Sequence, residues 1–190
     1  MNIENPKFIV YTGPMFGAKT SRLLMTLERY KYQRKNIMLF KPLLDDRYSC
    51  EDVVTHSGWR MSAKSIKTGA DVLEILANEN IHPSVIAVDE AFMIPGIADA
   101  LIWLYRSGFT VIVSTLDLSA TGQVFKEVEK MLPWATQVEK CSAICTICGK
   151  EAFYTHKKQL SGNEIEIGGD ELYEPRCLSH HLSILLYRDA

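Results

Sequence analysis

The first residues that could do chemistry form a glycine-containing stretch near the N-terminus. It reads Gly13-Pro14-Met15-Phe16-Gly17-Ala18-Lys19-Thr20 and follows a short apolar run. The pattern is close to G-x-x-x-x-G-K-S/T, a loop whose backbone N–H groups cradle phosphates at the N-terminus of a helix. In such a loop Lys19 reaches the β- and γ-phosphates of a nucleotide, and the hydroxyl of Thr20 lies on Mg²⁺. The stretch therefore predicts phosphate binding, and the alternative is a simple turn that leaves Lys19 and Thr20 in solvent.

One position of this loop departs from the pattern. The glycine expected immediately before the lysine is replaced by Ala18, and Gly17 precedes it. Glycine at that position allows the backbone to approach a phosphate closely, whereas the methyl group of alanine takes up room. The degree of activity that the loop supports is therefore open.

A pair of carboxylates ends an apolar run in the middle of the chain. Asp89 and Glu90 follow directly after residues 84–88. Ligands of a parallel sheet gather beyond the carboxyl ends of its strands, so both side chains would lie beside the phosphate loop if the two strands were neighbours. One carboxylate could then hold Mg²⁺, and the other could act as a general base. The alternative is a solvated strand end whose acids cap a helix.

Cysteines and a histidine in the last third of the chain have the spacing of a metal site. Cys145-x-x-Cys148 and Cys177-x-x-His180 are two pairs of candidate ligands. Zn²⁺ takes four nitrogen or sulfur ligands, and four protein ligands leave no open position for catalysis. The pattern therefore predicts a structural zinc site, and the alternative is a set of buried thiols with a surface histidine.

Two further residues leave the choice of ligands open. Cys141 and His181 are close enough in sequence that either could replace a neighbour on the metal. The cysteine count of five is odd, and the chain shows no export signal. Both features argue against a framework of disulfides and in favour of metal binding.

Apolar runs alternate with helical periodicity through the first two thirds of the chain. Short runs rich in β-branched and aromatic residues predict strands over 7–12, 36–41, 84–88 and 109–114. Apolar positions at helical spacing predict helices over 19–34, 70–77 and 97–106. This alternation indicates an α/β fold with a parallel sheet covered on both faces. The polar stretch 42–60 is predicted to be a long loop of the kind that usually binds something.

The pattern changes at about residue 140. Short β-prone runs at 152–155 and 164–167 lie among the cysteines, and a closing helix is predicted over 178–187. We therefore expect a nucleotide-binding core of residues 1–140 and a zinc-binding lobe of residues 141–190.

The composition is that of an ordinary globular protein. The 21 basic and 23 acidic side chains give a formal net charge of −2, and 47% of the 190 residues are hydrophobic. This balance excludes a disordered charged tail, a collagen-like fibre and a protein held to DNA by bulk charge. No stretch reaches the roughly 18 apolar residues of a membrane helix, and the N-terminus lacks the profile of a signal peptide. We therefore expect a cytoplasmic protein with no membrane partner.

Taken together, these elements resemble the class II thymidine kinases, the zinc-containing cellular and bacterial type, over essentially the whole chain. Besides the phosphate loop, the segments that match are Lys41-x-x-x-Asp45-x-Arg47-Tyr48 with Thr55-His56, Val88-Asp89-Glu90-Ala91, Leu116-Asp117 with Gly122 and Phe125, Cys145-x-x-Cys148-Gly149-Lys150, and Gly168-Gly169-x-x-x-Tyr173-Glu174-Pro175-Arg176-Cys177 with His180. The resemblance implies a P-loop NTPase-like parallel sheet with flanking helices and a small C-terminal zinc lobe. It also implies ATP-dependent phosphorylation of the 5′-hydroxyl of thymidine, a step of pyrimidine salvage.

The resemblance further implies roles for the matching residues. Glu90 would be the general base that takes the proton of the 5′-hydroxyl, while Lys19 and Arg47 would stabilise charge on the transferring phosphoryl group. ATP and Mg²⁺ would contact Gly13, Pro14, Met15, Phe16, Gly17, Ala18, Lys19, Thr20, Asp45 and Asp89. The nucleoside base would lie against Met15, Met93, Leu116, Phe125, Ile167 and Tyr173.

Cofactors and partners also come with the resemblance. A structural Zn²⁺ on Cys145, Cys148, Cys177 and His180 would tie down a loop, the family's lasso, that covers the nucleoside and keeps water out. Members of the family are typically homotetramers that thymidine triphosphate inhibits. The expected partners are therefore thymidine, ATP, this inhibitor and further copies of the chain.

Departures from the family pattern leave two other functions open. Besides Ala18, Phe92 and Met93 replace a glutamine and a phenylalanine, and Ala120 stands where the family has an aromatic residue. One alternative is a catalytically weak or silent nucleotide-binding relative with altered nucleoside specificity. The other, which rests on the zinc-ligand spacing, is a zinc ribbon that binds nucleic acid and is fused to an NTPase-like domain. Acidic residues outnumber basic ones in 141–190, which disfavours contact with phosphate backbones, so we expect no nucleic acid partner.

Overall fold

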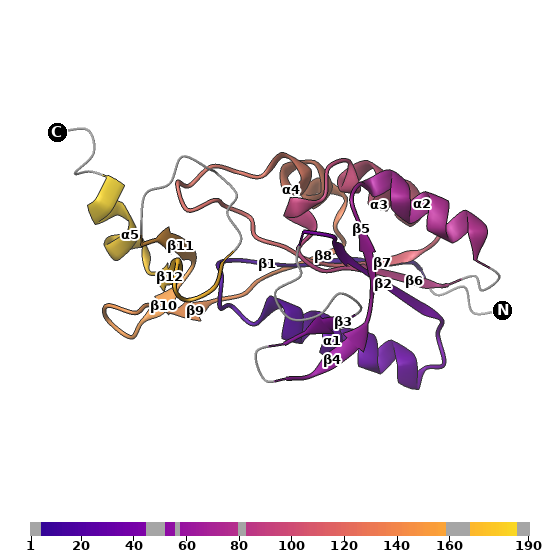
Figure 1. Ribbon diagram of the computed structural model, residues 1–190, viewed down its shortest axis with the longest axis horizontal. Coiled ribbons are helices and arrows are strands. Elements are labelled where there is room, and N and C mark those ends of the chain that lie inside the picture. The colour runs from indigo at the N-terminus through magenta and orange to yellow at the C-terminus, as the bar shows by residue number, and fades with distance from the viewer. Residues whose placement is uncertain (1–4, 45–51, 56–57, 80–82, 159–167, 186–190) are drawn as a thin grey trace.

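Six parallel strands form the central sheet of the computed structural model, which describes residues 5–44, 52–55, 58–79, 83–158 and 168–185 (Figure 1). Their order across the sheet is β5-β2-β6-β7-β1-β8. They span β1 Phe8–Thr12, β2 Ile37–Pro42, β5 Lys64–Ile66, β6 Val85–Val88, β7 Thr110–Ser114 and β8 Gln137–Lys140. The four inner strands are buried along most of their length, as expected of a parallel sheet with both faces covered. The predicted α/β class is therefore confirmed.

Helices cover both faces of this sheet. They span α1 Lys19–Tyr32, α2 Gly69–Asn78, α3 Ile97–Arg106 and α4 Lys126–Met131, with short 3₁₀ turns at η1 Ala91–Met93 and η2 Leu132–Trp134. Figure 1 shows α1 on one side of the sheet and α2, α3 and α4 together on the other. On α1 the fully buried Leu23, Leu24 and Leu27 recur at helical spacing, which explains why this helix packs by one face.

The hydrophobic core has two halves, and β1 contributes to both of them. Phe8 and Val10 belong to the half that packs against α2 and α3, whereas Ile9 and Tyr11 belong to the half under α1. Successive side chains of a strand point to opposite faces of the sheet. A continuous apolar run is therefore what a strand between two helical layers requires.

The segment 42–60 is not the simple loop that its polarity predicted. β3 (Asp52–Val54) and β4 (Arg60–Ser62) pair antiparallel, and Val53 and Met61 pack into the core under α1. The prediction was wrong here because a three-residue strand with one exposed face carries too few apolar residues to give a signal. Residues 45–51 and 56–57 lie outside the described part of the chain.

Residues 141–158 and 168–185 form a small unit at one end of the sheet, which we call the C-terminal lobe (Figure 1). Two antiparallel strand pairs, β9 with β10 and β11 with β12, are followed by one helix. These elements span β9 Ala143–Ile144, β10 Glu151–Ala152, β11 Tyr154–Lys157, β12 Tyr173–Arg176 and α5 Leu178–Leu185. The lobe follows directly on β8, and the backbone N–H of its first residue, Cys141, donates to the carbonyl oxygen of Thr12 at the end of β1 at 2.7 Å.

Most of the predicted elements are confirmed. The strands and helices expected over residues 7–114 correspond to β1, β2, β6, β7, α1, α2 and α3. The strand expected over 152–155 is divided between β10 and β11, and the closing helix is α5. The run 164–167 and residues 186–187 lie outside the described residues. Within the described ranges, no helix combines the length and the apolar character needed to cross a bilayer.

Candidate active site and metal centre

The predicted phosphate loop, residues 13–20, joins the carboxyl end of β1 to the N-terminus of α1. Gly13 has φ +125°, and a Cβ atom built on it would lie 2.3 Å from the carbonyl oxygen of Cys141, so only glycine fits there. Phe16 and Ala18 also have positive φ, 65° and 56°, in the left-handed region that residues with side chains rarely adopt. The loop is thus held in a conformation that two of its own residues do not favour.

Lys19 lies inside this loop and not in solvent. Its side chain is buried, and its Nζ donates to the carbonyl oxygen of Pro14 at 2.6 Å. Burial lowers the pKa of Lys19, while attraction to the carboxylates of Glu90 and Asp89 opposes that shift. The alternative in which Lys19 is a solvated first-turn residue is therefore excluded. A phosphate oxygen could take the place of the Pro14 carbonyl as its partner.

The carboxylate of Asp89 accepts hydrogen bonds from hydroxyl groups on two other elements. Thr20 Oγ1 donates to both carboxylate oxygens, at 3.1 and 3.2 Å, and Ser114 Oγ donates to Oδ1. The residue is 5% exposed. A hydroxyl and a carboxylate that meet in this way are the oxygen ligands that Mg²⁺ accepts beside a phosphate loop, so these residues fit that ion.

The route by which Asp89 meets the loop differs from the one we expected. β6 and β1 are not neighbours, because β7 lies between them in the sheet. Contact between the acidic strand end and the loop therefore does not come from adjacent strands. It forms because Thr20, in the first turn of α1, reaches across to Asp89, and Ser114 at the end of β7 fills the space between the strands.

Glu90 stands next to Asp89 with an unusual backbone. Its φ of 50° and ψ of 44° place it in the left-handed region. Such conformations cost free energy and gather at functional sites. Its half-buried side chain lines the same cavity as Lys19 and Asp89. The structure thus brings together these three predicted residues, and their chemical roles stay predictions.

A cavity opens between the phosphate loop, the ends of β2 and β6, the β3–β4 hairpin and the C-terminal lobe. Its lining residues are Met15, Phe16, Gly17, Ala18, Lys19, Thr20, Ser21, Lys41, Asp52, Val53, Val54, Thr55, Asp89, Glu90 and Gly169. Lys41 and Ser114 were not assigned to the site from the sequence. Lys41 is buried, and its Nζ donates to the carbonyl oxygen of Asp52 at 3.1 Å. The sequence feature that could have identified Lys41 and Ser114 is a polar residue near the end of an apolar strand. Asp89 has the same feature.

Apolar side chains cluster beside the phosphate loop. Leu116, Phe125 and Val128 are buried together, and Met15 and Phe92 pack against them. The ring centroids of Phe92 and Phe125 are 4.7 Å apart. We call these five residues the apolar cluster. This cluster joins Met15 of the phosphate loop to Leu116. In the family pattern, Leu116-Asp117 opens the lasso.

The remaining predicted site residues lie away from the apolar cluster or fall outside the described ranges. Met93 is half-buried in η1, and Tyr173 is buried on β12, where Nζ of Lys157 lies 5.9 Å from its ring centroid. Neither belongs to the apolar cluster. Asp45, Arg47 and Ile167 lie outside the described residues. Their predicted roles stay predictions.

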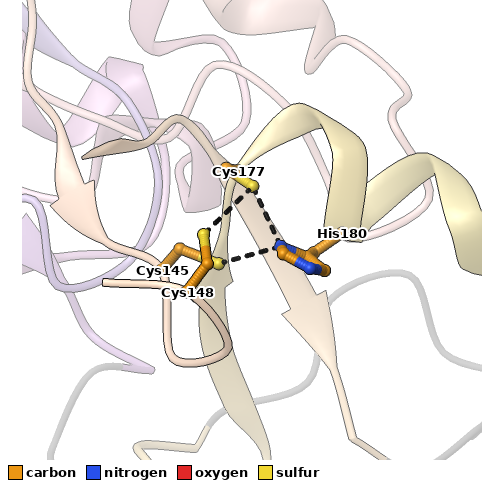
Figure 2. Close-up of side chains that lie close together, drawn as sticks. All are labelled: Cys145, Cys148, Cys177 and His180. Atoms are coloured by element: carbon orange, nitrogen blue, oxygen red, sulfur yellow. Dashed lines mark hydrogen bonds between the residues drawn. The ribbon is translucent and has the colours of Figure 1, made fainter. Parts of the chain in front are cut away.

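The four predicted metal ligands meet in the C-terminal lobe (Figure 2). One ligand atom from each of Cys145, Cys148, Cys177 and His180 lies within 4.8 Å of all the others. Sγ of Cys177 is 3.1 Å from Nδ1 of His180, and the Sγ atoms of Cys148 and Cys177 are 3.8 Å apart. The two ligand pairs come from the turn after β9 and from the start of α5. We call this arrangement the metal cluster.

The electrostatics at Cys145 favour a bound cation. Burial raises the pKa of the Cys145 thiol, but backbone N–H groups of Cys177, Ile147 and Cys148 outweigh that effect and lower it to about 6. The thiolate is the form that binds a metal. Three sulfurs and one imidazole nitrogen are also the donor set of a closed structural zinc site, so the residues fit this metal.

The two alternative ligands lie outside the cluster. Cys141 is buried beneath the phosphate loop, where its Cβ would be 3.4 Å from a Cβ built on Gly17. His181 is buried against Tyr154, with the two rings stacked at 5.0 Å. In the described part of the chain, the group with metal-binding geometry consists of the four residues that the ligand spacing predicted.

Comparison with known proteins identifies the family. The parallel sheet, the phosphate loop and the acidic strand end together are typical of nucleotide-binding α/β proteins. The thymidine kinase family matches residues 6–181. The chain belongs to the thymidine kinase family, as its motifs predicted.

Curated relatives agree with this assignment over almost the full chain. A thymidine kinase of Thermococcus kodakarensis is 38% identical over 184 residues, covering 91% of this chain and 92% of the relative. A thymidine kinase of Pyrobaculum aerophilum is 36% identical over 182 residues, covering 92% and 97%. Among solved structures, a genome-packaging NTPase of Sulfolobus turreted icosahedral virus 2, in complex with sulfate, overlaps at a TM-score of 0.45 and 17% identity, covering 76% of this chain and 77% of the other. A likeness that low carries no information on function.

Proposed function

We propose that this protein transfers the γ-phosphoryl group of ATP to the 5′-hydroxyl of thymidine. The observation that carries the proposal is the meeting of Lys19, Thr20, Asp89 and Glu90 in one cavity of a chain that belongs to the thymidine kinase family. Phosphoryl transfer needs little covalent chemistry from the protein, and positioning and charge stabilisation supply most of the acceleration. For that task the cavity contains the buried ammonium groups of Lys19 and Lys41 and the carboxylates of Asp89 and Glu90.

Each residue has a distinct role in this proposal. Glu90 accepts the proton of the attacking 5′-hydroxyl, and Lys19 leaves the Pro14 carbonyl to neutralise the phosphoryl oxygens. Arg47 adds a second positive charge. Thr20, Asp89 and Asp45 hold Mg²⁺, which when bound neutralises charge on the phosphates of ATP. The lower pKa that burial gives Lys19 reflects a poorly solvated ammonium, and an incoming phosphate would stabilise its charged form.

The thymine base is proposed to lie between the core and the C-terminal lobe. Met15, Leu116 and Phe125 of the apolar cluster would form one wall. Met93, Tyr173 and the backbone near Ile167 would complete the pocket. Packing of Met15 in this cluster supports the proposal because the same residue is part of the phosphate loop, so donor and acceptor would be bound side by side.

The remaining proposals concern the metal and the assembly. We propose that the metal cluster holds a structural Zn²⁺, which stabilises the C-terminal lobe and ties down the lasso. We also propose a division near residue 140, a homotetramer, inhibition by thymidine triphosphate and a cytoplasmic location. Nucleic acid and membranes are not among the proposed partners.

A second candidate function is a nucleotide-binding relative with weak or altered catalysis. Two observations favour it. Ala18 occupies a left-handed backbone position that suits glycine, and the Phe92 side chain packs in the apolar cluster where the family has glutamine. Both residues would act on binding geometry and not on the general base.

One experiment separates the two functions. Purified protein with Mg-ATP is assayed for phosphorylation of thymidine, deoxyuridine, deoxycytidine and deoxyguanosine. The matched control is Glu90→Gln, which keeps the size of the side chain and removes the base. We expect thymidine monophosphate from the wild type and at least about 100-fold less from the control, which is the usual contribution of a general base.

The outcomes lead to different conclusions. Product from another nucleoside alone would keep the kinase and place the change of specificity at Phe92 and Met93. No product from any nucleoside, with folded protein that still binds ATP, would favour the silent relative. Equal rates for wild type and Glu90→Gln would overturn the assignment of the base.

A further inference from the structure

Two neighbouring residues of the phosphate loop are held by the C-terminal lobe. The backbone N–H of Met15 donates to Thr155 Oγ1 at 3.0 Å, although 140 positions separate the two residues in sequence. The side chain of Phe16 packs against the buried cluster of Ala143, Cys145 and Ala152. The tip of the loop is therefore held by the lobe as well as by the apolar cluster of the core.

Both contacts lie close to the metal cluster. Cys145, which Phe16 packs against, is itself one of the four ligands. Thr155 is 4% exposed and lies on β11 opposite Pro175 of β12, two positions before the ligand Cys177. A change in the geometry of the metal cluster would therefore alter Cys145, which Phe16 contacts, and Cys177, which lies two positions from the residue opposite Thr155.

The loop needs such support because its own residues do not favour its shape. Phe16 and Ala18 both have positive φ, which for residues with side chains persists only where the surroundings hold it. Within the loop, the N–H of Gly17 donates to the carbonyl oxygen of Pro14 at a long 3.3 Å. The hydrogen bond from the lobe acts at Met15, next to the strained Phe16, and the packing acts on Phe16 itself.

We propose that Thr155 and Phe16 are positioning residues through which the C-terminal lobe sets the conformation of the phosphate loop. As a consequence, metal retention by the lobe and nucleotide binding by the loop strengthen each other. The inference rests on the proposed function in one respect, because it needs a nucleotide bound at the loop. Coupling between two binding sites is reciprocal, so it can be measured from either side.

The test measures how tightly the protein binds its metal. Zinc-loaded protein is brought to equilibrium with a colour-forming chelator, with and without ATP, in an excess of Mg²⁺ that occupies the ATP. We expect ATP to raise the zinc affinity of the wild type by about fivefold or more, the lower range of typical coupling. Titration calorimetry of metal-free and zinc-loaded protein should show weaker ATP binding without the metal.

Variants at Thr155 identify the contact that transmits the effect. Thr155→Val keeps the shape of the side chain and removes the acceptor. We therefore expect ATP to have little effect on zinc binding by this variant, and we call the effect of ATP the protection by ATP. Thr155→Ser keeps the hydroxyl and should restore the protection. Phe16→Leu tests the packing contact and is the second variant if the valine protein does not fold.

A matched control exists at the other end of β1. Thr136 Oγ1 accepts the N–H of Phe8 at 2.9 Å, the same kind of bond but far from the phosphate loop. Thr136→Val should therefore keep the full protection by ATP. This control also removes any contribution from zinc binding by free ATP, because that contribution is equal in all variants.

The outcomes are distinct. If calorimetry shows no ATP binding to the zinc-loaded wild type, the proposed function and this inference both fall. If ATP binds without changing the zinc affinity, the inference is overturned while the proposed function stands. The inference is also overturned if Thr155→Val retains full protection, or if Thr136→Val loses as much as Thr155→Val does.

Discussion

The phosphate pocket and the metal cluster are held together by different means. In the pocket, Lys19, Lys41 and Asp89 are buried charged residues from separate elements of the core. In the cluster, the ligands come from a short turn and the start of one helix, and N–H groups of the same segments surround the sulfur of Cys145. The pocket therefore depends on the whole fold, whereas the cluster depends on local geometry and on the metal that we propose for it.

The two regions also differ in backbone strain. The described pocket contains the non-glycine positive-φ residues Phe16, Ala18 and Glu90, while the C-terminal lobe has a positive φ at Gly149, where glycine adopts it freely. The pocket keeps a costly geometry that phosphate binding can use. The described part of the lobe shows no such strain, and this is consistent with a supporting role.

The largest effect should follow removal of the metal. A chelator should unfold the C-terminal lobe, because the binding free energy of a structural zinc is folding free energy for a segment with a small core. Hydrogen exchange should show loss of protection in residues 141–158 and 168–185, while β1, β6 and β7 keep theirs. Thymidine phosphorylation should stop and return when zinc is added back. If the lobe kept its protection from hydrogen exchange without metal, it would not depend on the metal, and this difference from the phosphate pocket would be disproved.

The next effect concerns the acidic strand end. Asp89→Asn should lower kcat by about 100-fold or more, because the site loses a charged ligand for Mg²⁺. Zinc content should not change. The control is Asp99→Asn on α3, where an exposed carboxylate pairs with Lys130 at 2.6 Å and should contribute little. A similar loss in both variants, or zinc loss with Asp89→Asn, would show that pocket and cluster are not separate.

The same contrast explains which parts could be predicted from the sequence. The meeting of Cys145, Cys148, Cys177 and His180 could be predicted because C-x-x-C and C-x-x-H spacing is local, and a tetrahedral site needs no knowledge of distant contacts. The phosphate loop and Asp89 were found because strand ends mark ligand sites in parallel sheets. The sheet order was not available, so the position of β7 between β1 and β6 was missed.

Elements with little apolar character were missed for a different reason. β5 and β8 contribute one apolar residue each to the edges of the sheet, and backbone pairing with their neighbours places them there. Thr155 has no chemical motif around it, and its contact with Met15 spans most of the chain. Long-range pairing of polar residues leaves no periodic signal in a single sequence.

A smaller effect is expected from the apolar cluster. Phe92→Leu should weaken thymidine binding by about two- to tenfold, the value of an aromatic pair beyond its buried area, because Phe125 loses its partner. ATP affinity and zinc content should stay the same. Trp103→Leu on α3 is the control, since that exposed side chain lies away from the cavity. Equal weakening of ATP and thymidine binding would show that Phe92 supports the phosphate loop and not the base pocket.

The smallest effect tests the strain itself. Ala18 has φ 56° and ψ 26°, a conformation that costs an L-residue about 1–2 kcal/mol and costs glycine nothing. Glycine also makes the unfolded chain more flexible, which takes back about 0.4–1 kcal/mol. Ala18→Gly should therefore raise the free energy of unfolding by about 0.5 kcal/mol, as measured by urea denaturation of the zinc-loaded protein.

The matched substitution at an ordinary position should have the opposite sign. Ala77 is exposed in the last turn of α2, and Ala77→Gly should lower the free energy of unfolding by up to about 1 kcal/mol, the helix propensity difference in a helix interior. Opposite signs would establish that the phosphate loop holds its backbone against local preference. Equal destabilisation by both substitutions would mean that residue 18 is unstrained. The loop would then need no support from the C-terminal lobe at that position. The two regions would differ only in whether their residues come from separate elements or from local segments.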